Sequence, residues 1–187
     1  MIRMILRAAL KRFERQNQYD ASYGEFVLNN SLSAFWKFTR VQAIGKHNED
    51  VPRDPYYAAK ITSSRIADCG PCTQLVTNWA QKSGVPEEII RAVLTRDFSK
   101  MPADVELTVR FTEAVLAKSL EADELRERIR KQWGNRAVIT LALAITAGQM
   151  YPTVKYALGY GHACTLVRVG NELVRVPHEM PKMLQAI

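Results

Sequence analysis

The stretch Asp68-Cys69-Gly70-Pro71-Cys72-Thr73-Gln74 holds two of the three cysteines in this chain, separated by two residues. A CxxC pair at the start of a helix places its first sulfur among backbone N–H groups without partners, at the positive end of the helix dipole, which favours thiolate over thiol. Pro71 suits a first helical turn, and Asp68 is the expected N-cap. We therefore take Cys69, Cys72 and Asp68 as candidate catalytic residues of a reversible dithiol and disulfide pair.

The composition is that of an ordinary soluble globular protein. The chain has 187 residues, of which 24% are charged and 47% hydrophobic, enough for one domain with a buried core. The most continuous apolar run, residues 137–150, is shorter than the roughly 20 residues that cross a bilayer, so we expect a buried helix there. Three cysteines, two of them clustered, are too few for a secreted disulfide scaffold. We expect a cytoplasmic location.

The positive charge is concentrated at the N-terminus. Of the net charge of +7, the first fifteen residues carry +4, because five arginines and lysines there face only Glu14. A local excess of this kind is a poor match to a broad nucleic-acid footprint, and no zinc-finger, homeodomain or RNA-binding motif is present in the sequence. We expect no nucleic-acid partner.

The same segment predicts a basic amphipathic helix. Its apolar face carries Ile2, Ile5, Leu6, Ala9, Leu10 and Phe13. Its basic face carries Arg3, Arg7, Lys11 and Arg15. Such a helix can lie on an anionic membrane surface, or it can dock on its own core or on a sister subunit. We favour docking on protein.

Apolar periodicity and helix start signals predict an all-α fold. Further helices are expected over residues 54–67 with Asp54 as N-cap, over 72–84, from Pro86, from Pro102, over 123–133, and over 138–151 with Pro152 kinking or ending the last. The expected organisation is an N-terminal helical extension over residues 1–50, packed on a helical domain with a C-terminal tail over residues 51–187.

The tail has a different pattern. Residues 165–169 and 172–176 flank Gly170-Asn171, which is a two-residue hairpin signal. We expect a short β-hairpin that must lean on the helices, because an isolated hairpin is only marginally stable.

Segments between Asp54 and Gly161 resemble the carboxymuconolactone decarboxylase and alkylhydroperoxidase D-like family. In the order of that family they are the helix leading into Cys69-Gly70-Pro71-Cys72, then residues 83–90, residues 109–114 and residues 157–159. The resemblance implies an all-helical, homo-oligomeric protein that reduces a small-molecule peroxide, without a cofactor, and is recharged by a dithiol reductant protein. On the family pattern Cys72 is the peroxidatic cysteine and Cys69 the resolving one. Helix electrostatics alone favours Cys69, so the assignment stays open.

The sequence departs from this family at its proton relay. The glutamate twelve residues before the first cysteine is Tyr57 here, and the histidine four residues after the second is Val76. General acid and base assistance contributes about 10²- to 10⁴-fold to such reactions. Asp68, Tyr57, Thr73 and Gln74 are only weak substitutes, and His162 is an alternative relay group from the C-terminal segment.

Three functional hypotheses follow. The leading one is a thiol-disulfide oxidoreductase or peroxidase-like antioxidant protein that uses Cys69 and Cys72. The second is a non-enzymatic or redox-sensing binding or assembly protein on the same fold, which the missing relay favours. The third and least favoured is a metal site formed by both cysteines with His162 and Cys164, because the HxC spacing is poor for ligands on a helix. Trp79 is expected in the core.

Overall fold

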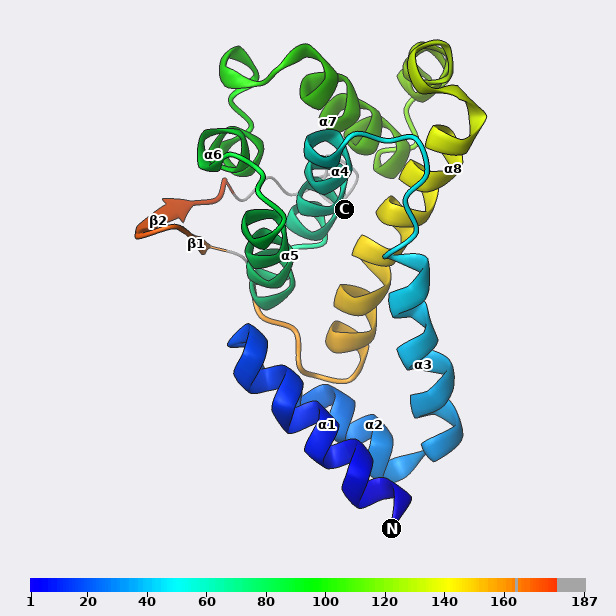
Figure 1. Ribbon diagram of the computed structural model, residues 1–187, viewed down its shortest axis with the longest axis vertical. Coiled ribbons are helices and arrows are strands. Elements are labelled where there is room, and N and C mark those ends of the chain that lie inside the picture. The colour runs from blue at the N-terminus through cyan, green and yellow to red at the C-terminus, as the bar shows by residue number, and fades with distance from the viewer. Residues whose placement is uncertain (164, 178–187) are drawn as a thin grey trace, which may run out of the picture.

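The computed structural model describes residues 1–163 and 165–177 and shows an all-α fold with one β-hairpin (Figure 1). The elements of this part of the chain are α1 (Ile2–Asn17), α2 (Ser22–Asn30), α3 (Leu32–Ile44), α4 (Arg53–Ile66), α5 (Gly70–Lys82), α6 (Glu87–Thr95), a short 3-10 helix η1 (Phe98–Lys100), α7 (Ala103–Leu116), α8 (Glu121–Ala157), β1 (Leu166–Val169) and β2 (Glu172–Arg175). The predicted all-α class and the predicted hairpin are confirmed.

Helix α4 occupies the centre of the fold. Its residues 58–65 are all buried. Ala58 and Ile61 belong to an apolar cluster shared with α5, α6 and the hairpin, whereas Tyr56 and Ala59 belong to a second cluster shared with α7 and α8. The helix is therefore covered on both sides by core, and the remaining helices of the domain are arranged around it.

A close approach fixes α4 against α8. The Ser63 hydroxyl donates to the carbonyl of Ile145 at 2.8 Å, and the Gln149 amide donates to the carbonyl of Ser63 at 2.6 Å. A Cβ atom at Gly148 would lie only 2.5 Å from Ser63 Oγ. Glycine at this position lets the two backbones pack closely enough for these hydrogen bonds to form.

The N-terminal helices α1, α2 and α3 fold back on the domain. Helices α1 and α2 lie side by side, and α3 returns along α8 (Figure 1). The basic face of α1 is turned toward α2, where Arg7 donates to Asn29 Oδ1 at 2.6 Å and pairs with Glu25 at 3.5 Å. The apolar face contributes Leu10 and Phe13 to an aromatic cluster with the chain's own core. In this structure α1 thus docks on its own chain.

Helix α8 differs in part from the prediction. The break expected between residues 133 and 138 occurs at Gly134, whose φ of 85° and ψ of 178° are non-helical and suited to glycine. The helix does not end at Pro152 but continues to Ala157. A proline removes only one intrahelical hydrogen bond. The turns beyond it are held by a hydrogen bond from the Tyr156 hydroxyl to the Asp68 carbonyl, at 2.9 Å. The expectation that Asp54 caps α4 is also wrong, because the N-cap is Pro52 and Asp54 lies in the first turn.

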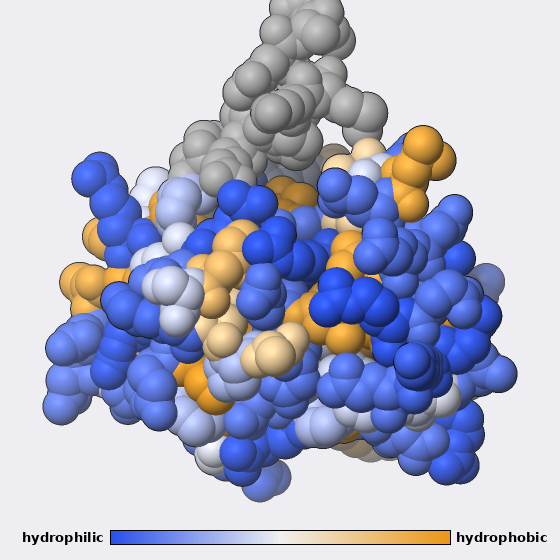
Figure 2. Space-filling view, turned by 90° about the horizontal axis from the view of Figure 1, so that it is seen from above, coloured by the Kyte–Doolittle hydropathy of each residue, from blue (hydrophilic) through white to orange (hydrophobic). Residues whose placement is uncertain are grey.

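By length and composition alone, α8 is also apolar enough to cross a membrane, a test that core helices of soluble proteins pass as well. Ala137, Leu141, Ala144 and Ile145 of this helix are buried in the core. The end of the molecule opposite α1, where α7 and the charged first half of α8 lie, has a largely hydrophilic surface (Figure 2).

The hairpin leans on the helices as expected. Strands β1 and β2 are antiparallel, with Val167 opposite Val174. Both valines belong to the same core cluster as α6. The Gln74 side chain on α5 adds two hydrogen bonds to the backbone of Arg168, at 2.7 and 3.0 Å.

The ion pair between α4 and α7 gives the first prediction. The Arg65 side chain, 4% exposed, pairs with Glu113 at 2.9 Å, and Arg96 pairs with the same carboxylate at 2.9 Å. Because Glu113→Gln removes the carboxylate charge that pairs with the buried Arg65 guanidinium, we expect the free energy of unfolding in urea to fall by about 2–3 kcal/mol. The matched control Glu106→Gln, which breaks an exposed pair with Arg110 on the same helix, should change it by less than about 0.5 kcal/mol. Equal losses in the two variants would contradict this interpretation.

Candidate redox site

Cys69 and Cys72 form a disulfide at the N-terminus of α5, with Cα atoms 5.2 Å apart. Cys69 is itself the N-cap, and its sulfur accepts a hydrogen bond from the backbone N–H of Cys72 at 3.3 Å. Pro71 lies in the first turn, as predicted. Cys69 is fully buried and Cys72 is 6% exposed. Cys72 is therefore the more accessible residue of the pair.

Asp68 does not cap α5, contrary to prediction. Its backbone has a left-handed φ of 51°. A left-handed residue reverses the chain direction between the end of α4 and the start of α5, and aspartate tolerates this conformation better than most residues. Asp68 therefore shapes the connection and accepts the Tyr156 hydrogen bond through its carbonyl, while Cys69 takes the cap position.

The segment after α8 passes over the start of α5. The backbone N–H of Gly70 donates to the carbonyl of His162 at 3.0 Å. This bond satisfies one of the N–H groups that a helix start leaves without an intrahelical partner. The His162 residue is exposed, so it is the backbone of this segment that contacts the site.

A cavity of about 600 Å³ opens beside Cys72, between the N-terminal helices and helices α4, α5 and α8. Its walls are mainly aromatic and aliphatic, with Phe13, Tyr23, Phe38 and Trp79 among the lining residues. Volumes of about 300–1,000 Å³ with mainly apolar walls are typical of small-molecule sites. Trp79, which we expect in the core, is partly buried and packs against the core cluster. It also lines this cavity.

Lys60 lies in the same cavity within a cage of aromatic rings. Its Nζ is 4.9 Å from the centroid of the Tyr56 ring and 5.5 Å from the centroids of both Tyr57 and Trp79. It donates to the carbonyl of Gly45 at 2.8 Å. Burial, and to a smaller extent the positive charge of Lys46, lower the pKa of Lys60 to about 8.

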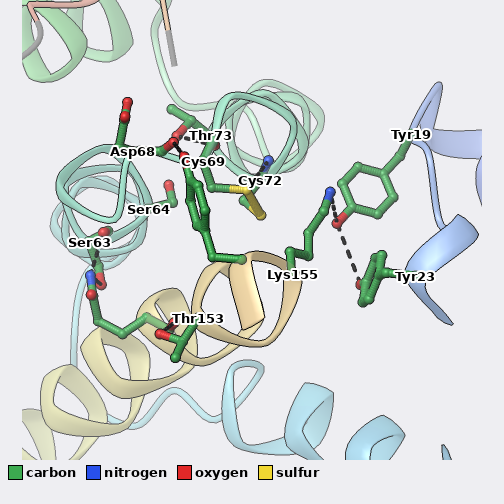
Figure 3. Close-up of a disulfide and its surroundings, with 12 residues drawn as sticks. Tyr19, Tyr23, Ser63, Ser64, Asp68, Cys69, Cys72, Thr73, Thr153 and Lys155 are labelled. Carbon is green, nitrogen blue, oxygen red and sulfur yellow. Dashed lines mark hydrogen bonds between the residues drawn. A yellow bond between two sulfur atoms is a disulfide. The ribbon is translucent and has the colours of Figure 1, made fainter. Parts of the chain in front are cut away.

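A second buried lysine, Lys155 on α8, lies close to the disulfide. Figure 3 shows its side chain between the disulfide on one side and Tyr19 and Tyr23 on the other. Nζ is 3.4 Å from the Tyr19 hydroxyl and 4.8 and 5.1 Å from the Tyr19 and Tyr23 ring centroids. Lys155 is only 2% exposed, and this burial lowers its pKa, an effect that Asp20 partly opposes. Burial also raises the pKa of Tyr19 to about 12, so that its hydroxyl stays protonated.

Neither Lys60 nor Lys155 was predicted from the sequence to lie at the site. Lys155 had a visible signal, because it is the only lysine in the apolar segment of residues 137–158. The two positions that the family resemblance assigns to a relay, Tyr57 and Val76, do line the cavity with Cys72. The Tyr57 hydroxyl is 2.6 Å from Ser83 Oγ.

The metal hypothesis receives no geometric support from residues 1–163 and 165–177, where no group of three or more histidine, cysteine, aspartate or glutamate side chains is arranged to hold an ion. Cys164, the fourth ligand of that hypothesis, lies outside the described residues.

No protein-family model, no curated protein and no solved structure matches this chain. The resemblance to the alkylhydroperoxidase D-like family therefore remains a prediction based on the segments quoted above.

The lowered pKa of Lys60 predicts a pH dependence of stability. Above pH 8 the folded chain has released the Lys60 proton, whereas the unfolded chain keeps it up to the ordinary pKa of 10.5. The unfolded state then binds more protons, so stability rises with pH. We expect Lys60→Met to remove about 2 kcal/mol of this rise between pH 7 and 9.5, measured by urea unfolding. The lowered pKa of Lys155 makes the same contribution to the pH dependence in the wild type and in the variant, so the difference between their profiles reports Lys60 alone. Parallel profiles for the wild type and the variant would contradict the prediction.

Proposed function

We propose that the protein is a thiol-disulfide oxidoreductase of the peroxidase-like kind, with Cys69 and Cys72 as its redox pair. The observation that carries the proposal is the position of Cys72, which belongs to the disulfide and also lines a cavity large enough for a small organic molecule. A purely structural disulfide has no need of such a cavity. In a reducing cytoplasm, which we expect for this chain, disulfides are usually catalytic or redox-sensing.

The accessibility of the two sulfurs supports Cys72 as the nucleophile. The cavity exposes Cys72 to a bound molecule, while Cys69 is fully buried behind it as the helix cap. Helix electrostatics favours Cys69 as the thiolate, yet a buried thiolate cannot reach a substrate. This order agrees with the roles implied by the family resemblance, in which Cys69 resolves the oxidised Cys72.

The reaction balances with the two cysteines as the source of both electrons. The Cys72 thiolate attacks the O–O bond of a hydroperoxide, forms a sulfenic acid and releases an alkoxide that takes up a proton as the alcohol. The Cys69 thiol then attacks Cys72 Sγ, water leaves, and the disulfide forms. A dithiol reductant reduces the disulfide and completes the cycle.

Lys155 supports the proton transfers that this cycle needs. Its lowered pKa brings the neutral amine closer to physiological pH, so it can accept the Cys72 proton, and its ammonium form can protonate the leaving alkoxide. The Tyr19 hydroxyl, 3.4 Å away, continues the hydrogen-bonded path. Lys155 thus takes over the role of the family's relay glutamate and histidine, whose positions are occupied by Tyr57 and Val76 in this chain.

The proposal extends to a homo-oligomer. Large apolar side chains remain exposed on α3 and on α8, among them Trp36 at 45% and Ile139 at 55%. A membrane-surface role has less support, because arginines on the basic face of α1 already contact α2.

A redox-sensing binding protein is the second candidate, and the cavity favours it independently of any turnover. In that case the disulfide would form and break without catalytic consumption of peroxide.

Peroxide consumption tests the leading proposal. With dithiothreitol as reductant and cumene hydroperoxide as substrate, we expect the wild type to turn over and Cys72→Ser to lose activity. Without dithiothreitol, Cys69→Ser should consume one equivalent of hydroperoxide, with a sulfenic acid trapped by dimedone. If the wild type consumes no more peroxide than the double serine variant, the peroxidase proposal fails, and a Cys69–Cys72 reduction potential near that of the cytosol would then favour the redox sensor.

Lys155→Met tests the acid and base role. In the Cys69→Ser background, we expect the loss of this lysine to raise the pKa of Cys72, measured as the pH dependence of iodoacetamide alkylation, and to slow the single turnover with peroxide ten- to a hundredfold. The exposed Lys131→Met is the matched control on the same helix and should leave both unchanged. If the pH dependence of Cys72 alkylation is unchanged in Lys155→Met, Lys155 has no acid and base role, even if the variant is less stable to unfolding.

A further inference from the structure

The cavity beside Cys72 has a one-sided charge. Its lining includes three lysines, Lys46, Lys60 and Lys82, and no aspartate or glutamate. Lys46 and Lys82 are exposed and lie at the rim, whereas Lys60 is 8% exposed. The remaining lining is mostly apolar, with aromatic side chains from α1, α3, α4, α5 and α8. Such a site combines apolar walls with one buried cation.

We propose that this cavity binds an apolar carboxylate, with the carboxylate at Lys60 and the hydrocarbon body against the aromatic walls beside Cys72. The inference rests on the proposed function only in treating this ligand as the substrate class of the Cys72 site. Binding itself needs neither sulfur.

The surroundings of Lys60 leave room for an anionic partner. An ammonium group has three donors. One is used at 2.8 Å by the Gly45 carbonyl, and the Tyr56 hydroxyl is a more distant partner at 3.5 Å. The aromatic rings of Tyr56, Tyr57 and Trp79 attract the cation without neutralising it. A carboxylate supplies the missing counter-charge in a place where burial strengthens the pairing.

The walls select the rest of the ligand. The cavity is lined by residues that pack against one aromatic cluster, among them Leu10 and Phe13 of α1, Phe38 of α3 and Tyr151 of α8. Each methylene buried against such a surface strengthens binding about fourfold. The cavity volume of about 600 Å³ suits a chain of moderate length rather than a short acid such as acetate.

Calorimetry with decanoate tests the proposal on the full chain. We expect one molecule of decanoate to bind the wild type and the Cys69→Ser/Cys72→Ser variant with similar affinity, and hexanoate to bind at least tenfold more weakly. Decanol and decyltrimethylammonium should also bind at least tenfold more weakly, because they lack the negative charge. Lys60→Met should weaken decanoate binding at least tenfold, and the exposed Lys131→Met should not change it.

A second measurement does not depend on the folding of Lys60→Met. In the Cys69→Ser protein, saturating decanoate should slow the alkylation of Cys72 by iodoacetamide at least fivefold, because it occupies the space beside that sulfur. The proposal is overturned if decanoate does not bind, if decanol binds equally well, or if Cys72 is alkylated at the same rate with and without decanoate. Decanoate binding without peroxide turnover would reject the proposed peroxidase and leave this inference standing. Peroxide turnover without decanoate binding would reject this inference and leave the proposed peroxidase standing.

Discussion

The close contact between α4 and α8 at Ser63 and Gly148 determines where the Cys69–Cys72 disulfide lies. With the two backbones held together there, the end of α4 has a fixed position, and residues 67–69 join it to α5. The left-handed Asp68 turns the chain within this short connection. Cys69 and Cys72 therefore start α5 near the second half of α8, whose Lys155 side chain lies between the disulfide and the two tyrosines (Figure 3). The geometry of the sulfurs follows from helix packing and needs no flexible loop.

The two buried lysines, Lys60 and Lys155, destabilise the folded state. Burial of an ammonium group in an apolar site disfavours its charged form, and the lowered pKa values of Lys60 and Lys155 express that cost. Aromatic rings and neutral oxygens offset only part of it, since no ion pair joins either lysine to a carboxylate among the described residues. Perturbed groups of this kind gather at functional sites. A methionine at either position would serve the core better, which makes packing a poor explanation for both residues.

Local signals in the sequence predicted most of the helices and the hairpin. Pro86 and Pro102 do stand immediately before helices, and Gly170-Asn171 does join two strands. These features depend on a few neighbouring residues. The cap of α5 was predicted wrongly because cap preference favours aspartate, whereas the tight connection requires a left-handed residue at that position.

The site was predicted only as a cysteine pair. Periodicity placed Lys60 on a helix, but its burial depends on the Gly45 loop and on Trp79, which lie far from it in the chain. Lys155 approaches the cysteines from a helix more than eighty residues downstream. The cavity itself is formed by residues from six helices, and no local pattern encodes the space between them.

Asn17, the last residue of α1, joins the N-terminal helices to α5. Its side chain accepts a hydrogen bond from the Trp79 indole at 3.1 Å, and its carbonyl accepts one from the Asn78 amide at 3.4 Å. The same indole forms one side of the cage around Lys60. The boundary expected near residue 50 therefore separates two parts of the sequence but not two parts of the site. Removing the first fifty residues would take away one wall of the cavity. It would also release the Trp79 indole, which contacts Lys60, so the extension is as much a part of the cavity as Cys72 is.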